Sequence, residues 1–138
     1  MPPEHPTERT TPRGQRPPAT VRELTRTVRA CTSCELHAQR TKPVVGVGPE
    51  DARIVVAGFV PHRHEDLQGV PFAGSARNLL HTALSDVGLD PAGVRFTTVV
   101  RCRPPGDRRP AFAEAQTCAA HLHAELRLVE PEVIVSLG

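Results

Sequence analysis

The sequence lacks tryptophan and tyrosine, so any aromatic stacking on a ligand must come from its four phenylalanines. No run of apolar residues approaches the roughly 20 that a membrane-spanning helix needs, and the N-terminus has no apolar core of a signal peptide. Its 138 residues suit one domain with one core. We therefore expect a soluble, cytoplasmic, monomeric protein with no membrane partner.

Lysine is nearly absent as well, because Lys42 is the only one and arginine supplies the rest of the 17 basic residues. The formal net charge of +2 is too small to predict a nucleic-acid partner by itself. One short stretch nevertheless concentrates four arginines: Arg101, Arg103, Arg108 and Arg109. Guanidinium groups bind phosphate through a planar fork, so we expect these four to contact phosphate; the alternative is a solvated loop without a ligand.

The first 19 residues contain six prolines and almost no large apolar side chain. Such a segment cannot bury enough surface to offset the entropy lost on ordering. We expect residues 1–19 to form a disordered tail and residues 20–138 to form the folded domain.

Helix and strand patterns alternate along this domain. Thr20 and Glu23 form a capping box at the start of the first helix, and Ser75 is placed to cap the second. The patterns predict helices at 20–30, 75–87 and 112–129 and strands at 52–58, 94–100 and 132–138. We therefore expect an α/β fold, three layers with a short parallel sheet and right-handed crossovers.

Ligands of such sheets bind at the carboxyl ends of the strands. A long loop at 59–74 and the arginine stretch at 101–109 both emerge at that end. The order of elements thus predicts one cleft lined by phenylalanine, histidine and arginine. We expect the other histidines to lie on helix surfaces without a role: His37, His81, His121 and His123.

The four cysteines fall into two pairs. Two residues separate Cys31 from Cys34, whereas Cys102 ends the second strand and Cys118 lies in the following helix. Because that helix can return Cys118 beside Cys102, four thiolates can share one centre. The spacing alone leaves a [4Fe–4S] cluster and structural zinc equally favoured, with two disulfides or four unrelated buried thiols as further alternatives.

Several segments together resemble family 4 uracil-DNA glycosylases, the iron–sulfur type of bacteria and archaea. They are Cys31-Thr-Ser-Cys34-Glu-Leu36, Gly46-x-Gly48 with Asp51-Ala52-Arg53, Glu65-Asp66-x-x-Gly69-x-Pro71-Phe72-x-Gly74, Val99-Val100-Arg101-Cys102-Arg103-Pro104-Pro105-Gly106-Asp107-Arg108, and Pro131 to Gly138. The resemblance runs from about Val28 to Gly138.

This resemblance implies that the four cysteines bind [4Fe–4S], with zinc as the alternative. It also implies excision of uracil, or a related deaminated base, flipped out of DNA in base excision repair. Phe72 occupies the position that stacks on the base. The implied base-binding residues are Gly58, Phe59, Pro61, Phe72 and Thr98.

Three departures touch the implied chemistry. Phe59 stands where the family has an acidic residue, and His62 replaces a glycine. Thr98 replaces the asparagine that reads uracil, and the closing histidine motif of the family is absent from the sequence given. Candidate catalytic groups are then sought in the nearby loop, where His62, His64 and Asp66 can hold or activate water.

The glycosylase interpretation therefore competes with others. A catalytically impaired iron–sulfur homologue that still binds DNA, or a truncated fragment of a longer glycosylase, would keep the cysteines and arginines. An iron–sulfur electron carrier without DNA is a further class. The resemblance favours the enzyme, a DNA glycosylase.

Overall fold

The computed structural model describes residues 16–138, so most of the tail predicted at residues 1–19 lies outside the described residues. The elements are α1 (Val21–Arg29), η1 (Glu35–Ala38), β1 (Ile54–Gly58), α2 (Arg63–Gln68), α3 (Ser75–Asp86), η2 (Pro91–Gly93), β2 (Val94–Thr98), η3 (Pro105–Asp107), α4 (Phe112–Val129) and β3 (Val133–Ser136). Within the described residues, no helix has the length and apolar character that crossing a membrane requires.

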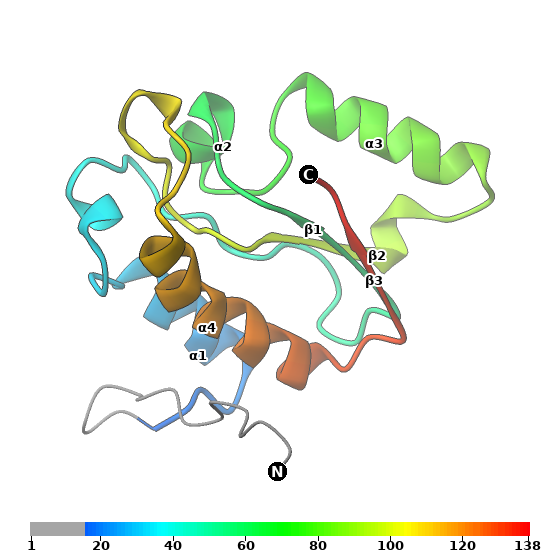
Figure 1. Cartoon of the computed structure of the whole chain (residues 1–138). Helices are drawn as coiled ribbons and strands as arrows, with labels where there is room; N and C mark the ends of the chain where they lie inside the picture. Colours follow the sequence, from blue (N-terminus) through cyan, green and yellow to red (C-terminus); the bar gives the residue numbers. More distant parts are fainter. Residues whose placement is uncertain (1–15) are drawn as a thin grey trace, which may run out of the picture.

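The three strands form a parallel sheet in the order β2-β1-β3. Val56 of the central strand pairs with Phe96 on one side and with Val135 on the other. Figure 1 shows α1 and α4 together on one face of the sheet and α3 on the opposite face. The predicted α/β fold with a short parallel sheet is confirmed.

The central strand carries the core on both of its faces. Val55 is fully buried and packs with Val21 and Val129, which come from α1 and α4. Val56 packs on the other face with Phe96 of β2 and with partly buried leucines of α3. Because side chains alternate along a strand, these two valines hold the helix layers against opposite faces of the sheet.

The first helix begins as the sequence predicts. Thr20 Oγ1 accepts a hydrogen bond from the Glu23 backbone N–H at 3.1 Å. The Glu23 carboxylate accepts one in return, but from the backbone N–H of Ala19 at 2.8 Å. Both bonds anchor the chain at the entry to α1, which delivers Cys31 just beyond its end.

Two local predictions are wrong. The expected loop at 59–74 contains α2, because the Glu65 carboxylate accepts a hydrogen bond from the His62 backbone N–H at 3.2 Å and stabilises the helix start. Gly69, with φ 71°, then lets the chain leave this helix. Ser75 is the first residue of α3 rather than its cap, since Gly74 holds the capping position.

The outer elements bury little. No residue of α3 is buried, and Leu79 is 73% exposed. Leu80 and Leu84 do contact the core. Every residue of β3 is also exposed, so the sheet is covered less on this edge than at β1 within the described residues.

Candidate metal centre and adjoining base pocket

All four cysteines line one open cavity of about 310 Å³. Cys31 and Cys34 follow α1, Cys102 follows β2, and Cys118 lies in the second turn of α4. Helix α4 packs against α1 and reaches back toward the end of β2 (Figure 1). All four side chains are free thiols, so three separate elements bring four sulfur atoms to one place.

The cavity gathers four thiols as potential donors. Among the described residues, no group of three or more His, Cys, Asp and Glu side chains is already arranged to hold a metal ion. Four cysteine thiolates are a ligand set that both structural zinc and a [4Fe–4S] cluster accept.

Backbone and side-chain donors surround the sulfurs. Arg40 Nη1 donates to Cys102 Sγ at 3.3 Å, and the backbone N–H of Arg101 donates to Cys118 Sγ at 3.1 Å. Hydrogen bonds to sulfur stabilise its charged form, so both contacts favour thiolate or metal-bound sulfur at the buried end of the cavity.

The thiols differ in acidity because their surroundings differ. A hydrogen bond with His121 lowers the pKa of Cys31 to about 6. Burial raises the pKa of Cys118 to about 12, and burial also raises the pKa of Cys102 against the opposing effect of Arg40. The two buried thiols therefore hold their protons in the absence of a metal and release them when one binds.

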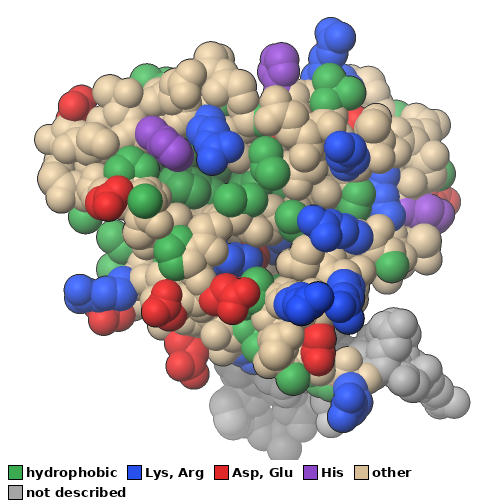
Figure 2. Space-filling model, turned by 180° about the vertical axis from the view of Figure 1, so that it is seen from behind, with side chains coloured by type: hydrophobic (Ala, Val, Ile, Leu, Met, Phe, Trp, Pro, Cys, Tyr) green, Lys and Arg blue, Asp and Glu red, His purple; other side chains and the backbone are tan. Residues whose placement is uncertain are grey.

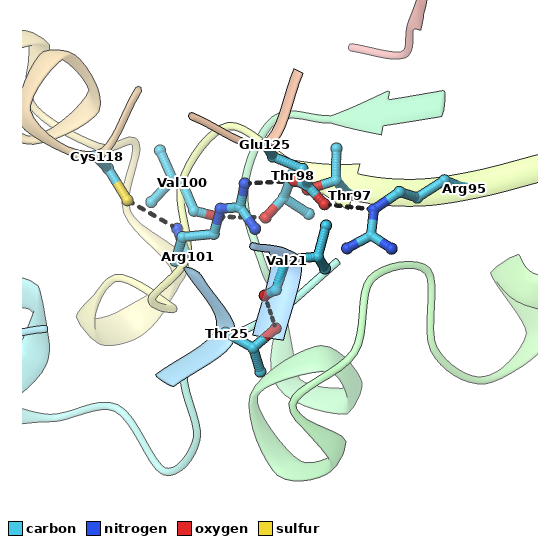
Figure 3. Close-up of polar contacts among 9 residues, drawn as sticks. All are labelled: Val21, Thr25, Arg95, Thr97, Thr98, Val100, Arg101, Cys118 and Glu125. Carbon is cyan, nitrogen blue, oxygen red and sulfur yellow. Dashed lines mark hydrogen bonds and ion pairs between the residues drawn. The ribbon is translucent and has the colours of Figure 1, made fainter. Parts of the chain in front are cut away.

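A buried charge network stands behind Cys118 (Figure 3). Glu125 of α4 is fully buried, and its carboxylate accepts hydrogen bonds from Arg95 Nε at 2.7 Å and Arg101 Nη2 at 2.9 Å. Thr97 Oγ1 donates to the same carboxylate. Burial alone would raise the pKa of Glu125, but Arg101, Thr97 and Arg95 together outweigh it and lower that pKa. The network ties α4 to β2 and to the residue beside Cys102.

Gly46 is required by this network. A Cβ at position 46 would overlap the Glu125 carboxylate and approach the Arg95 guanidinium to 2.8 Å. The glycine of the Gly46-x-Gly48 motif thus leaves room for a buried ion pair.

Sequence reasoning missed several residues of the centre. The prediction that His121 lies on the helix surface without a role is wrong, because His121 lines the cavity and hydrogen-bonds Cys31. His37 also lines it. His121 could have been found from the sequence, because it follows Cys118 by three residues and so lies on the same face of the helix. Neither Arg40 nor Glu125 has such a local pattern.

The candidate base pocket is a second pocket, which Phe72 lines with Val70, Leu80, His81 and Phe96. The Phe72 ring lies against Gly58, where a Cβ would stand 3.1 Å from the ring and 3.8 Å from Thr98. Phe72 has φ 50°, a left-handed conformation that is uncommon without glycine. Its ring meets Phe96 edge-on, with centroids 6.0 Å apart.

Two predicted base contacts are engaged inside the protein. Thr98 is buried, and its hydroxyl donates to the carbonyl of Val100 at 2.6 Å. Phe59 packs against Leu36 and Cys102 on the cysteine side. Pro61 is fully buried, so it shapes the chain below the pocket.

The predicted catalytic residues separate into two kinds. Asp66 is 4% exposed, and its carboxylate accepts a hydrogen bond from the Thr41 backbone N–H at 2.8 Å. This bond anchors the Asp66 carboxylate within the protein. His62 and His64 are both exposed at the start of α2, and the His64 ring lies near Gly74. The structure therefore leaves both imidazoles accessible to solvent.

The predicted phosphate contacts are mostly paired. Arg101 is 2% exposed, and its guanidinium pairs with Glu125 inside the protein. Arg103 pairs with the Asp107 carboxylate at 2.7 and 2.9 Å, and Arg108 pairs similarly with Glu114. Arg109 is exposed. Figure 2 shows basic side chains scattered over the rear face, with acidic ones among those in its lower half.

Comparison with known proteins agrees with this geometry. A family model described as "Uracil DNA glycosylase superfamily" matches residues 45–138. A type-4 uracil-DNA glycosylase of Archaeoglobus fulgidus is 42% identical over 116 residues, covering 84% of this chain and 58% of that protein. A type-4 uracil-DNA glycosylase of Thermotoga maritima is 43% identical over 111 residues, covering 80% and 58%.

A more distant match is the type-5 uracil-DNA glycosylase of Mycobacterium leprae, 38% identical over 114 residues, covering 70% of this chain and 49% of that protein. The chain thus spans little more than half the length of the curated relatives it matches.

Proposed function

This chain belongs to the uracil-DNA glycosylase superfamily, and from that premise we propose that it removes uracil, or a related deaminated base, from DNA in base excision repair. The observation that carries the proposal is the Phe72 ring, held against Gly58 at the carboxyl ends of β1 and β2. An aromatic face stacks on any base. A left-handed conformation at a residue other than glycine persists only where its surroundings impose it. The surroundings of Phe72 therefore hold its ring in one position, as stacking on a base requires.

We also propose that Cys31, Cys34, Cys102 and Cys118 hold a [4Fe–4S] cluster. The shared cavity and the type-4 relatives support it. When bound, the cluster supplies iron–thiolate bonds that cross-link the end of α1, the end of β2 and α4. Zinc remains the alternative, and metal analysis of the purified protein distinguishes the two.

The proposed reaction uses the chain's own residues near the pocket. Duplex DNA requires the base to be flipped out, after which Phe72 stacks on it. A water held by His62 or His64 adds to the sugar carbon while the bond to the base breaks. Asp66 Oδ1 accepts a hydrogen bond from the Thr41 backbone N–H, and the Thr98 hydroxyl donates to Val100, so neither is assigned a role in the step.

The direct test is uracil release from single-stranded and mismatched DNA by protein purified without oxygen. We expect release by the wild type, a loss of about 10-fold or more in Phe72→Leu, which keeps an apolar side chain but no stacking face, and a loss in a His62→Ala/His64→Ala double variant. Leu79→Ala, exposed on α3, is the matched control. No release by iron-loaded wild type that binds the same DNA would reject the proposal.

A second candidate is a homologue that binds DNA without cleaving the base. It is favoured by Phe59, which stands where the family has an acid and packs on the cysteine side. This candidate predicts binding that weakens with salt and yields no product. The measurement is the slope of the logarithm of the DNA-binding constant against the logarithm of the salt concentration. We expect Arg109→Gln to reduce the magnitude of this slope by about 0.9. Arg103→Gln should change it less, because Arg103 already pairs with Asp107.

A further inference from the structure

Arg40, just beyond η1, joins three separate parts of the metal-centre cavity. Its Nη1 donates to the carbonyl of Cys31 at 2.6 Å and to Cys102 Sγ at 3.3 Å. Its Nη2 donates to the carbonyl of Arg29, at the end of α1, at 3.3 Å. One half-buried guanidinium thus fastens the segment that carries the first cysteine pair to the third cysteine.

Arg101 lines the same cavity and has a donor to spare. Its Nη2 is bound to the Glu125 carboxylate at 2.9 Å. Its Nε is buried and has no hydrogen-bond partner. Among the described residues, it is the only buried side-chain nitrogen or oxygen of which this is true. Buried donors are nearly always satisfied, so the unpartnered Nε of a residue that lines the cavity is available to a ligand that accepts a hydrogen bond.

The charge of the cavity wall agrees. Arg40, Arg101, His37 and His121 line it, and no carboxylate does among the described residues. Four thiolates around iron and sulfide form an anionic group with sulfur acceptors. The wall therefore matches such an anion in both charge and hydrogen bonding.

We propose that Arg40 and Arg101 are positioning residues of the metal centre: Arg40 locks the first cysteine pair onto Cys102, and Arg101 Nε donates to the sulfur of an anionic cluster. The inference rests on the proposed [4Fe–4S] assignment. Donors aimed at cluster sulfur stabilise the more negative, reduced state, and outer residues that orient ligands also slow loss of the metal. Both arginines should therefore make the reduction potential of the cluster less negative and its release slower.

The test compares Arg40→Gln and Arg40→Lys with the control Arg29→Gln, whose side chain is exposed at the end of α1. Each anaerobic protein is assayed for iron, for the midpoint potential by spectroscopic redox titration, and for the rate of iron transfer to a chelator. We expect Arg40→Gln to load iron, to shift to a more negative potential and to lose iron about 10-fold faster. Arg40→Lys should recover part of both effects, and Arg29→Gln should match the wild type.

Arg101→Lys tests the second arginine without stranding Glu125, because a lysine keeps the positive charge opposite that carboxylate while removing Nε. We expect a more negative potential with an unchanged far-UV circular dichroism spectrum. If the Arg40→Gln and Arg101→Lys proteins both load iron and keep the wild-type potential and release rate, the inference about the arginines is overturned. The cluster assignment itself is then unaffected. A wild type that binds no iron would overturn the cluster assignment and this inference with it.

Discussion

The cysteine cavity and the Phe72 pocket lie near the same strand ends, yet their polar groups are used differently. Around the cavity, Arg40 and the backbone N–H of Arg101 donate to sulfurs, and His121 hydrogen-bonds Cys31. Near Phe72, the hydroxyl of Thr98 is bonded within the protein. The comparison teaches that the polar groups of this chain are arranged more completely around the cysteines than around Phe72.

Phe59 connects the two regions. It directly follows β1, at the position where the family has an acid, but it packs against Leu36, Val100 and Cys102. The residue that departs from the family therefore contributes to the apolar wall behind the cysteines. Substitutions on the cysteine side should lower the stability of the fold, whereas substitutions of Phe72 should reduce release of the base.

The largest effect is expected from Cys118→Ser. Metal binding contributes to folding because the site does not exist in the unfolded chain. Loss of one ligand at the buried end of the cavity should release the cluster and lower the Tm by on the order of 10 °C, measured by iron analysis and thermal melting. Gln116→Ala, at an exposed position of the same helix outside the cavity, is the control. A Cys118→Ser protein with full iron content would show that Cys118 is not a ligand.

Glu125→Ala should follow, with a loss of about 3–5 kcal/mol in the free energy of unfolding. The substitution leaves Arg95 and Arg101 buried without their counter-charge. Urea unfolding measures the loss, and Glu132→Gln, in an exposed ion pair, should change nothing measurable. Equal effects at the two glutamates would contradict the role of the buried network.

A pair of phenylalanine variants separates the two regions more finely. Phe59→Ala should cost about 2 kcal/mol of stability, less than a fully buried ring, and leave uracil release unchanged. Phe72→Leu should cost less than about 1.5 kcal/mol while reducing release. Urea unfolding and a base-release assay on both variants test this. A loss of release in Phe59→Ala without loss of stability would place Phe59 in the base pocket instead.

The smallest effect is on acid stability. The pKa of Glu125 is lowered from the ordinary value of 4.5 by Arg101, Thr97 and Arg95, against burial. Its contribution is therefore present above about pH 4.5 and is lost as the pH falls through the lower folded pKa. Unfolding measured between pH 3 and 6 should show a shallower acid decline for Glu125→Gln than for the wild type. Parallel curves would contradict this assignment.

The sequence predicts the elements well and the buried charges poorly. Strand and helix positions follow from apolar patterns and from the cap at Thr20, which act locally. Whether Arg101 meets phosphate or Glu125 depends on a side chain 24 residues away in α4, which no local pattern reveals. The anchoring of Asp66 is equally hidden from the sequence, because its partner is the backbone of Thr41, 25 residues away.

The grouping of the four cysteines can be predicted, because their spacing can be read from the sequence. The residues that contact the cysteines cannot be predicted in this way. His121 is the exception, since its helical spacing from Cys118 places it beside the cavity. Arg40 reaches Cys102 across 62 positions and becomes visible only in three dimensions.

The measurement that tests this account most directly is a combined iron, sulfide and zinc analysis of anaerobically purified protein, together with its visible absorption and unfolding curve. One cluster on the four cysteines predicts about four irons and four sulfides per chain, with colour lost when a chelator unfolds the protein. Colourless protein that binds one zinc, or no metal at all, and still unfolds cooperatively would contradict it.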